Sequence, residues 1–244
     1  MKSIDYKSLA KVFRDERTLT TREIMKRLKA FYPEAREGTL SARLHRLKDE
    51  GLLRNVSRGI YALGTKNTFE PAISKELKSM FRRIEKQFPF IDSLCIWDTM
   101  WLNDFTIHQA FSSIVIVETE RDTEHAVFEY VRSNYSPVFI SPTPKEVDNY
   151  IIATRKSFVV KPIVSEAPLM MVNETSIPRL EKILVDLFSE EDLFIAFQGS
   201  ELRTIFRTAL SKYNMSLSTL RRYASRRGKV EEIEELIKSF GEFA

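Results

Sequence analysis

The sequence predicts an α+β protein in two parts: a small N-terminal domain over residues 1–66, and a mixed α/β domain over residues 67–244 that ends in a helical segment. Three observations predict this division. Helical periodicity gives way to two strand-like runs before residue 64. Strand-like and helix-like runs then alternate up to residue 174, and helical periodicity alone returns from residue 178 onward.

The N-terminal domain begins with three helical patterns. The first covers residues 4–13. The second begins at Thr20 and Glu23, which have the Thr-x-x-Glu spacing of a capping box, and ends at the Phe31-Tyr32-Pro33 run. The third covers residues 37–50 and places Leu40, Leu44 and Leu47 on one side, so this side is expected to face a core.

Two strand-like runs, LLRNV and GIYAL, follow the third helix and meet across Ser57-Arg58-Gly59. Three helices followed by a hairpin are the layout of a winged helix-turn-helix. In that layout the early residues of the third helix enter the major groove of DNA, and the hairpin tip meets phosphates or the minor groove. The residues predicted to contact DNA are Thr39, Ser41, Ala42, Arg43, His45, Arg46, Arg54, Ser57 and Arg58.

Charge favours the same interpretation. Residues 1–66 carry sixteen Lys and Arg against eight Asp and Glu, whereas residues 67–201 carry thirteen against twenty-one. A net charge of +8 suits a polyanionic partner, and the acidic middle region does not. Two alternatives remain: the basic residues form only a solvated surface, or the winged helix binds protein and not DNA.

The composition favours a soluble cytoplasmic protein. Apolar residues make up 43% and charged residues 30% of the 244, and the apolar runs are too short to span a bilayer. The N-terminus has no apolar signal core, and the one cysteine, Cys95, cannot form an internal disulfide. The histidines and Cys95 do not have zinc-site spacing, and no glycine-rich phosphate loop is present, so we expect neither a metal nor a cofactor.

An enzymatic alternative rests on three carboxylates. Asp98 lies in one strand-like run, and Glu118 and Glu120 end another with their side chains on the same face. Such carboxylates can hold Mg²⁺, which would suit a winged-helix-targeted nuclease or nucleotidyltransferase. The acidic-x-Lys pair of many nucleases is missing, because Glu120 is followed by Arg121, and we therefore expect no enzyme activity.

A second basic segment, residues 202–229, carries eight Lys and Arg and no acidic residue. Its arginines occupy two predicted helices: Arg203, Arg207, Arg221, Arg222, Arg226 and Arg227. Arg203 and Arg207 are four residues apart, as are Arg222 and Arg226, so each pair shares a helix face. They form either a ridge for nucleic acid or for an acidic protein, or an internal set that pairs with the acidic middle region.

These motifs together resemble a known family. The hairpin GLLRNVSRGIYAL, the run CIWDTMWLNDFTIHQ and the strings SIPRLEKILVDLF, FQGSEL and LRRYASRRGK are similar to the AbiEi-like antitoxins of AbiE-type, type IV toxin–antitoxin systems. The resemblance covers most of the chain. It is more specific for LEKILVDLF and RRYASRR than for the winged helix, which many regulators share.

The resemblance implies a role in two parts. The winged helix would bind the operator of its own operon as double-stranded DNA and repress transcription. The C-terminal domain would antagonise a co-encoded nucleotidyltransferase-like toxin, without requiring a stable complex with it. The basic string containing Arg221, Arg222, Arg226 and Arg227 is the one part of the antitoxic surface that can be matched here.

Overall fold

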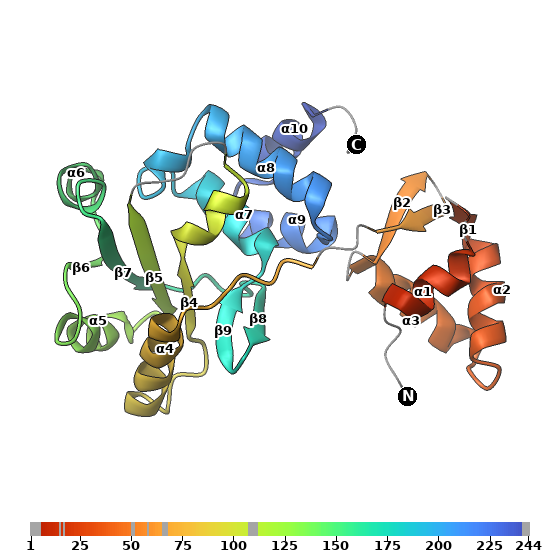
Figure 1. Ribbon diagram of the computed structural model, residues 1–244, viewed down its shortest axis with the longest axis horizontal. Coiled ribbons are helices and arrows are strands. Elements are labelled where there is room, and N and C mark those ends of the chain that lie inside the picture. The colour runs from red at the N-terminus through yellow and green to blue at the C-terminus, as the bar shows by residue number, and fades with distance from the viewer. Residues whose placement is uncertain are drawn as a thin grey trace. The chain divides into compact units, whose positions relative to one another are not determined.

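The computed structural model describes residues 6–14, 16, 18–49, 52–57, 59–64, 68–106 and 112–240, with the backbone alone described for 6–8, 49 and 55–57. The chain forms two compact units (Figure 1). Unit 1 contains Met1–Phe69 and Leu210–Thr219, and unit 2 contains Glu70–Ala209 and Leu220–Ala244. The domain boundary expected after residue 66 falls in residues 65–67, outside the described residues.

Unit 1 combines three helices with a small antiparallel sheet. Its elements are α1 (Tyr6–Phe13), β1 (Leu19–Thr20), α2 (Thr21–Phe31), α3 (Glu37–Asp49), β2 (Leu53–Ser57) and β3 (Ile60–Leu63). The strand order is β1-β3-β2, with Leu19 opposite Tyr61 and Leu53 opposite Leu63. The helices and the hairpin lie where the periodicity predicts them. The short strand β1 was not predicted.

Local signals explain how unit 1 is held together. The capping box is present: Thr20 accepts a hydrogen bond from the Glu23 N–H, and Glu23 accepts one from the Thr20 N–H. Arg27 donates to the carbonyl of Val12 at 2.9 Å, which ties α2 to the end of α1. The predicted stripes of α2 and α3 then meet in one core. Its buried members include Leu9, Phe13, Ile24, Leu28, Leu40, Leu44, Leu47 and Tyr61.

Unit 2 is built on a mixed four-stranded sheet. Its strands are β4 (Cys95–Asp98), β5 (Ser113–Thr119), β6 (Val138–Ile140) and β7 (Lys156–Pro162), in the order β4-β5-β7-β6. β4 is antiparallel to β5, while β5 and β6 run parallel to β7. A separate hairpin, β8 (Leu169–Val172) and β9 (Thr175–Pro178), follows it. Every residue of β5 is buried, as expected for a strand inside a layered fold.

Helices surround this sheet and complete unit 2 (Figure 1). They are α4 (Lys75–Gln87), the 3₁₀ helix η1 (Thr99–Asp104), α5 (Glu124–Arg132), α6 (Pro144–Glu146), the π-helix η2 (Val147–Ile151), α7 (Leu180–Ser189), the 3₁₀ helix η3 (Ile195–Phe197), α8 (Ser200–Lys212), α9 (Leu217–Arg226) and α10 (Val230–Lys238). Residues 210–212 at the end of α8 and 217–219 at the start of α9 belong to unit 1. The chain is therefore a mixed α+β protein with a C-terminal helical segment, as predicted. None of the helices among the described residues is long and apolar enough to cross a membrane.

Two elements that the sequence predicts in unit 2 are shorter in the structure. The run LCIWDTMWL predicts a strand over residues 94–102, but the strand ends at Asp98, because the Asp98 carboxylate accepts the Met100 N–H at 2.9 Å and caps η1. The run TPKEVDNYIIAT predicts one helix over residues 143–154. Its Thr143–Glu146 capping box forms, but the helix changes to the π-helix η2 after Glu146.

Candidate nucleic-acid interface

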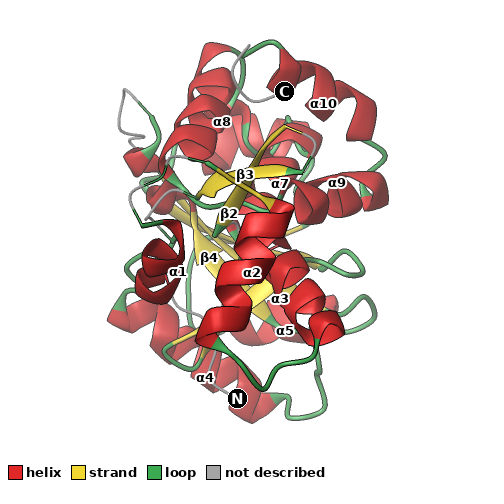
Figure 2. Cartoon of the chain, turned by 90° about the vertical axis from the view of Figure 1, so that its right-hand side faces the viewer, coloured by secondary structure: helices red, strands yellow, loops and turns green. Residues whose placement is uncertain are grey.

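The outward face of α3 is polar and exposed. Thr39, Ser41, Ala42, His45 and Arg46 are all exposed, whereas Leu40, Leu44 and Leu47 between them are buried. The helix is therefore fixed to the core of unit 1 through one side only. A Cβ atom added to Gly38 would meet no atom within 4 Å, so the start of this face is also unobstructed. Figure 2 looks onto α2 and α3.

Arg43 occupies a different environment from its neighbours on α3. Its side chain is half-buried, and the guanidinium carbon lies 4.5 Å from the centre of the Tyr32 ring, as in a cation–π contact. Sequence periodicity placed Arg43 at the flank of the DNA-facing side. In the structure its guanidinium lies over the ring of Tyr32, the C-cap residue of α2, so this contact is made within unit 1.

The hairpin is joined directly to the start of α2. The backbone N–H of Thr21 donates to the carbonyl of Gly59 at 2.8 Å, and the Thr21 hydroxyl donates to the same oxygen at 3.1 Å. Gly59 has a φ of +75°, a conformation that L side chains rarely adopt. Arg54 is exposed on β2. Ser57 ends β2 in a part where only the backbone is described, and Arg58 lies outside the described residues.

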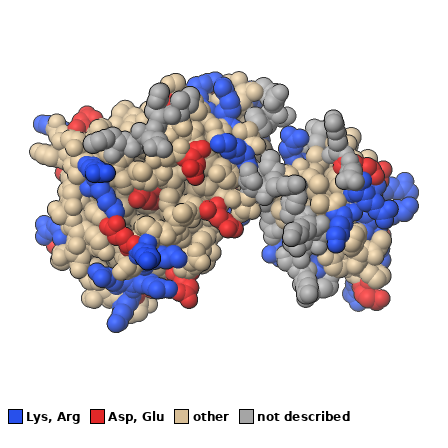
Figure 3. Space-filling view, in the orientation of Figure 1, with Lys and Arg blue, Asp and Glu red and all other residues tan. Residues whose placement is uncertain are grey.

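Sequence reasoning missed a set of basic residues on α2 and before α3. Arg22 and Lys26 are exposed one helical turn apart on α2, and Arg36 is exposed just before α3 begins. Figure 3 shows blue atoms gathered over the α2 side of unit 1. The i, i+4 spacing of Arg22 and Lys26 was a usable signal, because such residues share a helix face. These cations extend the charged surface beyond the predicted residues.

The arginines of the second basic segment have partners inside unit 2. Arg203 and Arg207 both lie over the Phe240 ring, each with its guanidinium carbon 5.3 Å from the ring centre. Arg221 pairs with Glu234 at 2.8 Å, and Arg226 pairs with Glu166. Arg227 donates to Glu190 at 2.7 Å. Among the described residues, Arg226 and Arg227 pair with carboxylates of the acidic middle region, as the internal alternative expects. Arg221 pairs with the C-terminal tail instead, and Arg203 and Arg207 contact an aromatic ring.

The three carboxylates of the enzymatic alternative lie in separate environments. Asp98 caps η1 and accepts the Ser113 hydroxyl at 2.8 Å. Glu120 accepts the backbone N–H groups of Asp92 and Ser93 at 3.0 and 2.9 Å. Glu118 is buried within β5 and forms ion pairs with two lysines. Among the described residues, no group of three or more His, Cys, Asp or Glu is arranged to hold a metal ion.

Glu118 belongs to a buried network of charges that sequence reasoning did not predict. It pairs with Lys182 and, at 3.2 Å, with Lys161 on the neighbouring strand β7. Lys182 also pairs with Asp186 at 2.5 Å, one turn further along α7. Tyr223 from α9 donates to Asp186 at 2.8 Å. The network therefore joins the sheet to α7 and α9, which are distant in the sequence.

Electrostatics keep this network charged in spite of its burial. Burial alone lowers the pKa of Lys182, but the carboxylates of Asp186 and Glu118 outweigh it and hold that pKa well above its ordinary value. Burial likewise raises the pKa of Asp186, but Lys182 and Lys161 outweigh it and lower that pKa. Each charge has an opposite charge beside it, which is the arrangement of a structural element of the fold.

Comparison with known proteins identifies a family. Residues 39–242 match the family model described as "Family of unknown function (DUF6577)". Because the match covers most of the chain, the chain belongs to this family. The matched segment begins on the exposed face of α3, includes the hairpin and continues through unit 2. No curated protein is significantly similar to the chain.

Proposed function

For this member of DUF6577, a family defined by sequence and not by an activity, we propose a DNA-binding transcriptional autorepressor. Unit 1 acts as a winged helix-turn-helix, with α3 as its recognition helix and the β2–β3 hairpin as its wing. The proposal rests above all on the exposed polar face of α3, which lies opposite a fully packed apolar side. A helix fixed in this way can enter the major groove without disturbing its own core.

The chemistry of that face suits the reading of bases. Ser41 and Ala42 are small, so the helix axis can approach the base edges closely. His45 and Arg46 carry donors that reach acceptors such as N7 and O6 of guanine. Arg22, Lys26, Arg36 and Arg54 are exposed on the surrounding elements, where they suit phosphates. The charge of +8 on residues 1–66 supports the same partner.

The DNA proposal is tested with the H45A/R46A variant and a duplex that carries the protein's own upstream region. We expect at least a tenfold loss of affinity for this duplex, because a well-placed base contact is worth about 1–3 kcal/mol. Affinity for a random-sequence duplex of equal length should fall less. The measurement is a fluorescence-anisotropy titration with both duplexes.

The R121A/H125A variant is the matched control. It removes the same two residue types from exposed positions of unit 2 and should retain the preference for the upstream duplex. Equal affinities of the unmodified chain for the two duplexes would contradict sequence-specific repression.

We further propose, on the resemblance to AbiEi-like proteins, that the chain is the antitoxin of a co-encoded nucleotidyltransferase-like toxin. The test is co-expression with the product of the neighbouring gene. Growth should be arrested by the toxin alone and restored by the full chain. Arrest that persists in the presence of the folded chain would remove the antitoxin role and leave DNA binding unaffected.

A further inference from the structure

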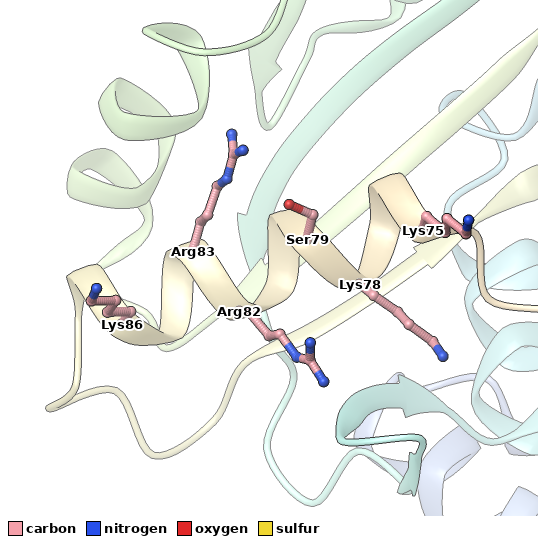
Figure 4. A pocket seen from close by; sticks show the side chains of 6 residues that line it. All are labelled: Lys75, Lys78, Ser79, Arg82, Arg83 and Lys86. Carbon is pink, nitrogen blue, oxygen red and sulfur yellow. The ribbon is translucent and has the colours of Figure 1, made fainter.

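The helix α4 of unit 2 has a strongly basic outward face. Leu77, Met80, Phe81 and Ile84 are buried on its inner side. The opposite side presents five cations around Ser79, and these six residues line one shallow surface pocket: Lys75, Lys78, Ser79, Arg82, Arg83 and Lys86. Figure 4 shows Arg83 projecting from one side of the helix axis and Lys78 and Arg82 from the other. Figure 3 shows blue atoms gathered over this helix.

Most of these cations have no ion-pair partner among the described residues. Arg82 pairs with Glu174 at 2.5 Å, but both side chains are more than half exposed, so water screens the pair strongly. Within the described part of the chain, no carboxylate lies at ion-pair distance from Lys75, Lys78, Arg83 or Lys86. The carboxylate of Glu76 on the same helix pairs instead with Lys156 at 2.6 Å.

Folding alone does not favour this arrangement. Lys78 and Arg82, and Arg82 and Lys86, are like charges four residues apart, a spacing that destabilises a helix. Lys75 is the first residue of α4, where the positive end of the helix dipole disfavours a cation. The surrounding sequence, residues 67–201, is net acidic. A concentration of positive charge that weakens its own helix indicates an anionic partner.

The shape of the face favours a nucleic-acid backbone. From Lys75 to Lys86 the row of charges extends about 16 Å along the helix. Duplex DNA carries one negative charge for about each 1.7 Å of its axis, so a row of this length lies opposite several phosphates. A protein partner would require apolar or aromatic anchors at the centre of the contact. The outward face of α4 offers Ser79 there instead.

We propose that the basic face of α4 is a second DNA contact, which binds phosphates of the duplex recognised by unit 1. This inference rests on the proposed function, because it takes the same duplex as its ligand. Contacts of this kind carry no sequence information, so α4 contributes affinity and salt dependence while α3 contributes specificity.

The test compares two triple variants of the full chain. K75A/R83A/K86A removes three exposed cations from α4, and alanine preserves its helix. R121A/K145A/R155A removes three exposed cations elsewhere on unit 2 and is the matched control. Affinities for the upstream duplex and for a random-sequence duplex are measured across a series of salt concentrations, and circular dichroism verifies that both variants fold.

The α4 variant should bind both duplexes at least about tenfold more weakly, with an unchanged ratio between them. Its plot of log affinity against log salt should be less steep by about 3, since each lost phosphate contact reduces the slope by about 1. The control should behave as the unmodified chain. An α4 variant that equals the control in affinity and slope would overturn the inference.

The outcomes for the two units are separable. If H45A/R46A loses the preference for the upstream duplex but the α4 variant equals the control, recognition stands and the α4 contact fails. If the unmodified chain binds both duplexes equally and the α4 variant still weakens binding, the α4 contact stands and operator recognition fails. An α4 variant that binds DNA normally but no longer restores growth beside the toxin would assign the face to a protein partner and contradict the DNA inference.

Discussion

At the scale of single residues, the buried charges of unit 2 make stability sensitive to the loss of one side chain. Lys182 is almost fully buried between Glu118 and Asp186. Paired charges of this kind contribute modestly to the free energy of unfolding as a set. The loss of one member is costly, because it leaves an uncompensated charge in a medium of low dielectric constant. Sequence could not predict the set, because Glu118, Lys161 and Lys182 meet only after the sheet and α7 have formed.

Replacing Lys182 by Met should lower the free energy of unfolding by about 3–5 kcal/mol, because Glu118 and Asp186 would lose the buried cation that pairs with both. The measurement is urea unfolding followed by circular dichroism. Lys145→Met, at an exposed position, is the control and should change stability by less than about 0.5 kcal/mol. Equal midpoints for the two variants would show that the network is not energetically important.

The same network sets the pH dependence of stability. The pKa of Asp186 is lower in the folded chain than its ordinary value, so its contribution is present at neutral pH and is lost as pH falls through the folded pKa. The pKa of Lys182 is raised, so its contribution is present below its ordinary pKa and is lost as pH rises through the folded pKa. The free energy of unfolding of Asp186→Asn should therefore fall less steeply than that of the unmodified chain as the pH is lowered. An equally steep fall would contradict this.

At the scale of elements, the hairpin depends on one glycine. Gly59 has a positive φ, and its carbonyl accepts both hydrogen bonds that join the hairpin to Thr21. Gly59→Ala should lower the free energy of unfolding by about 1–2 kcal/mol, because an L side chain is strained in this conformation. Gly38→Ala is the matched control: it lies in α3 in open space and should leave stability unchanged or raise it by up to about 1 kcal/mol. Thermal unfolding measures both, and equal effects would contradict the role of Gly59.

Elements fixed by local pattern were predictable, and elements fixed by distant pairing were not. The stripe of Leu40, Leu44 and Leu47 predicted the buried side of α3, because helical spacing alone decides it. β1 has two residues and exists only because β3 lies beside it. β9 was not predicted from the sequence, because its residues do not alternate clearly between apolar and polar, and its pairing with β8 forms only in the folded chain. β4 ends early at Asp98, whose carboxylate caps η1 and also accepts the hydroxyl of Ser113, fifteen residues away.

At the scale of the whole molecule, charge is distributed in a way that sequence totals conceal. The acidic sum over residues 67–201 includes the basic face of α4. Conversely, four of the eight basic residues in 202–229 form ion pairs within unit 2, namely Arg221, Arg226, Arg227 and Lys229. The net charges of the sequence segments therefore indicated the cationic surface of unit 1 but not the basic face of α4. Side-chain partners decide which positive charges remain available to a ligand.

The central claim, that α3 directs the chain to its own operator, is tested most directly by a hydroxyl-radical footprint over the upstream region of the gene. The full chain should protect a discrete segment, and H45A/R46A should lose that protection while R121A/H125A retains it. Uniform cleavage across the region, at protein concentrations that saturate random-sequence DNA, would contradict the claim.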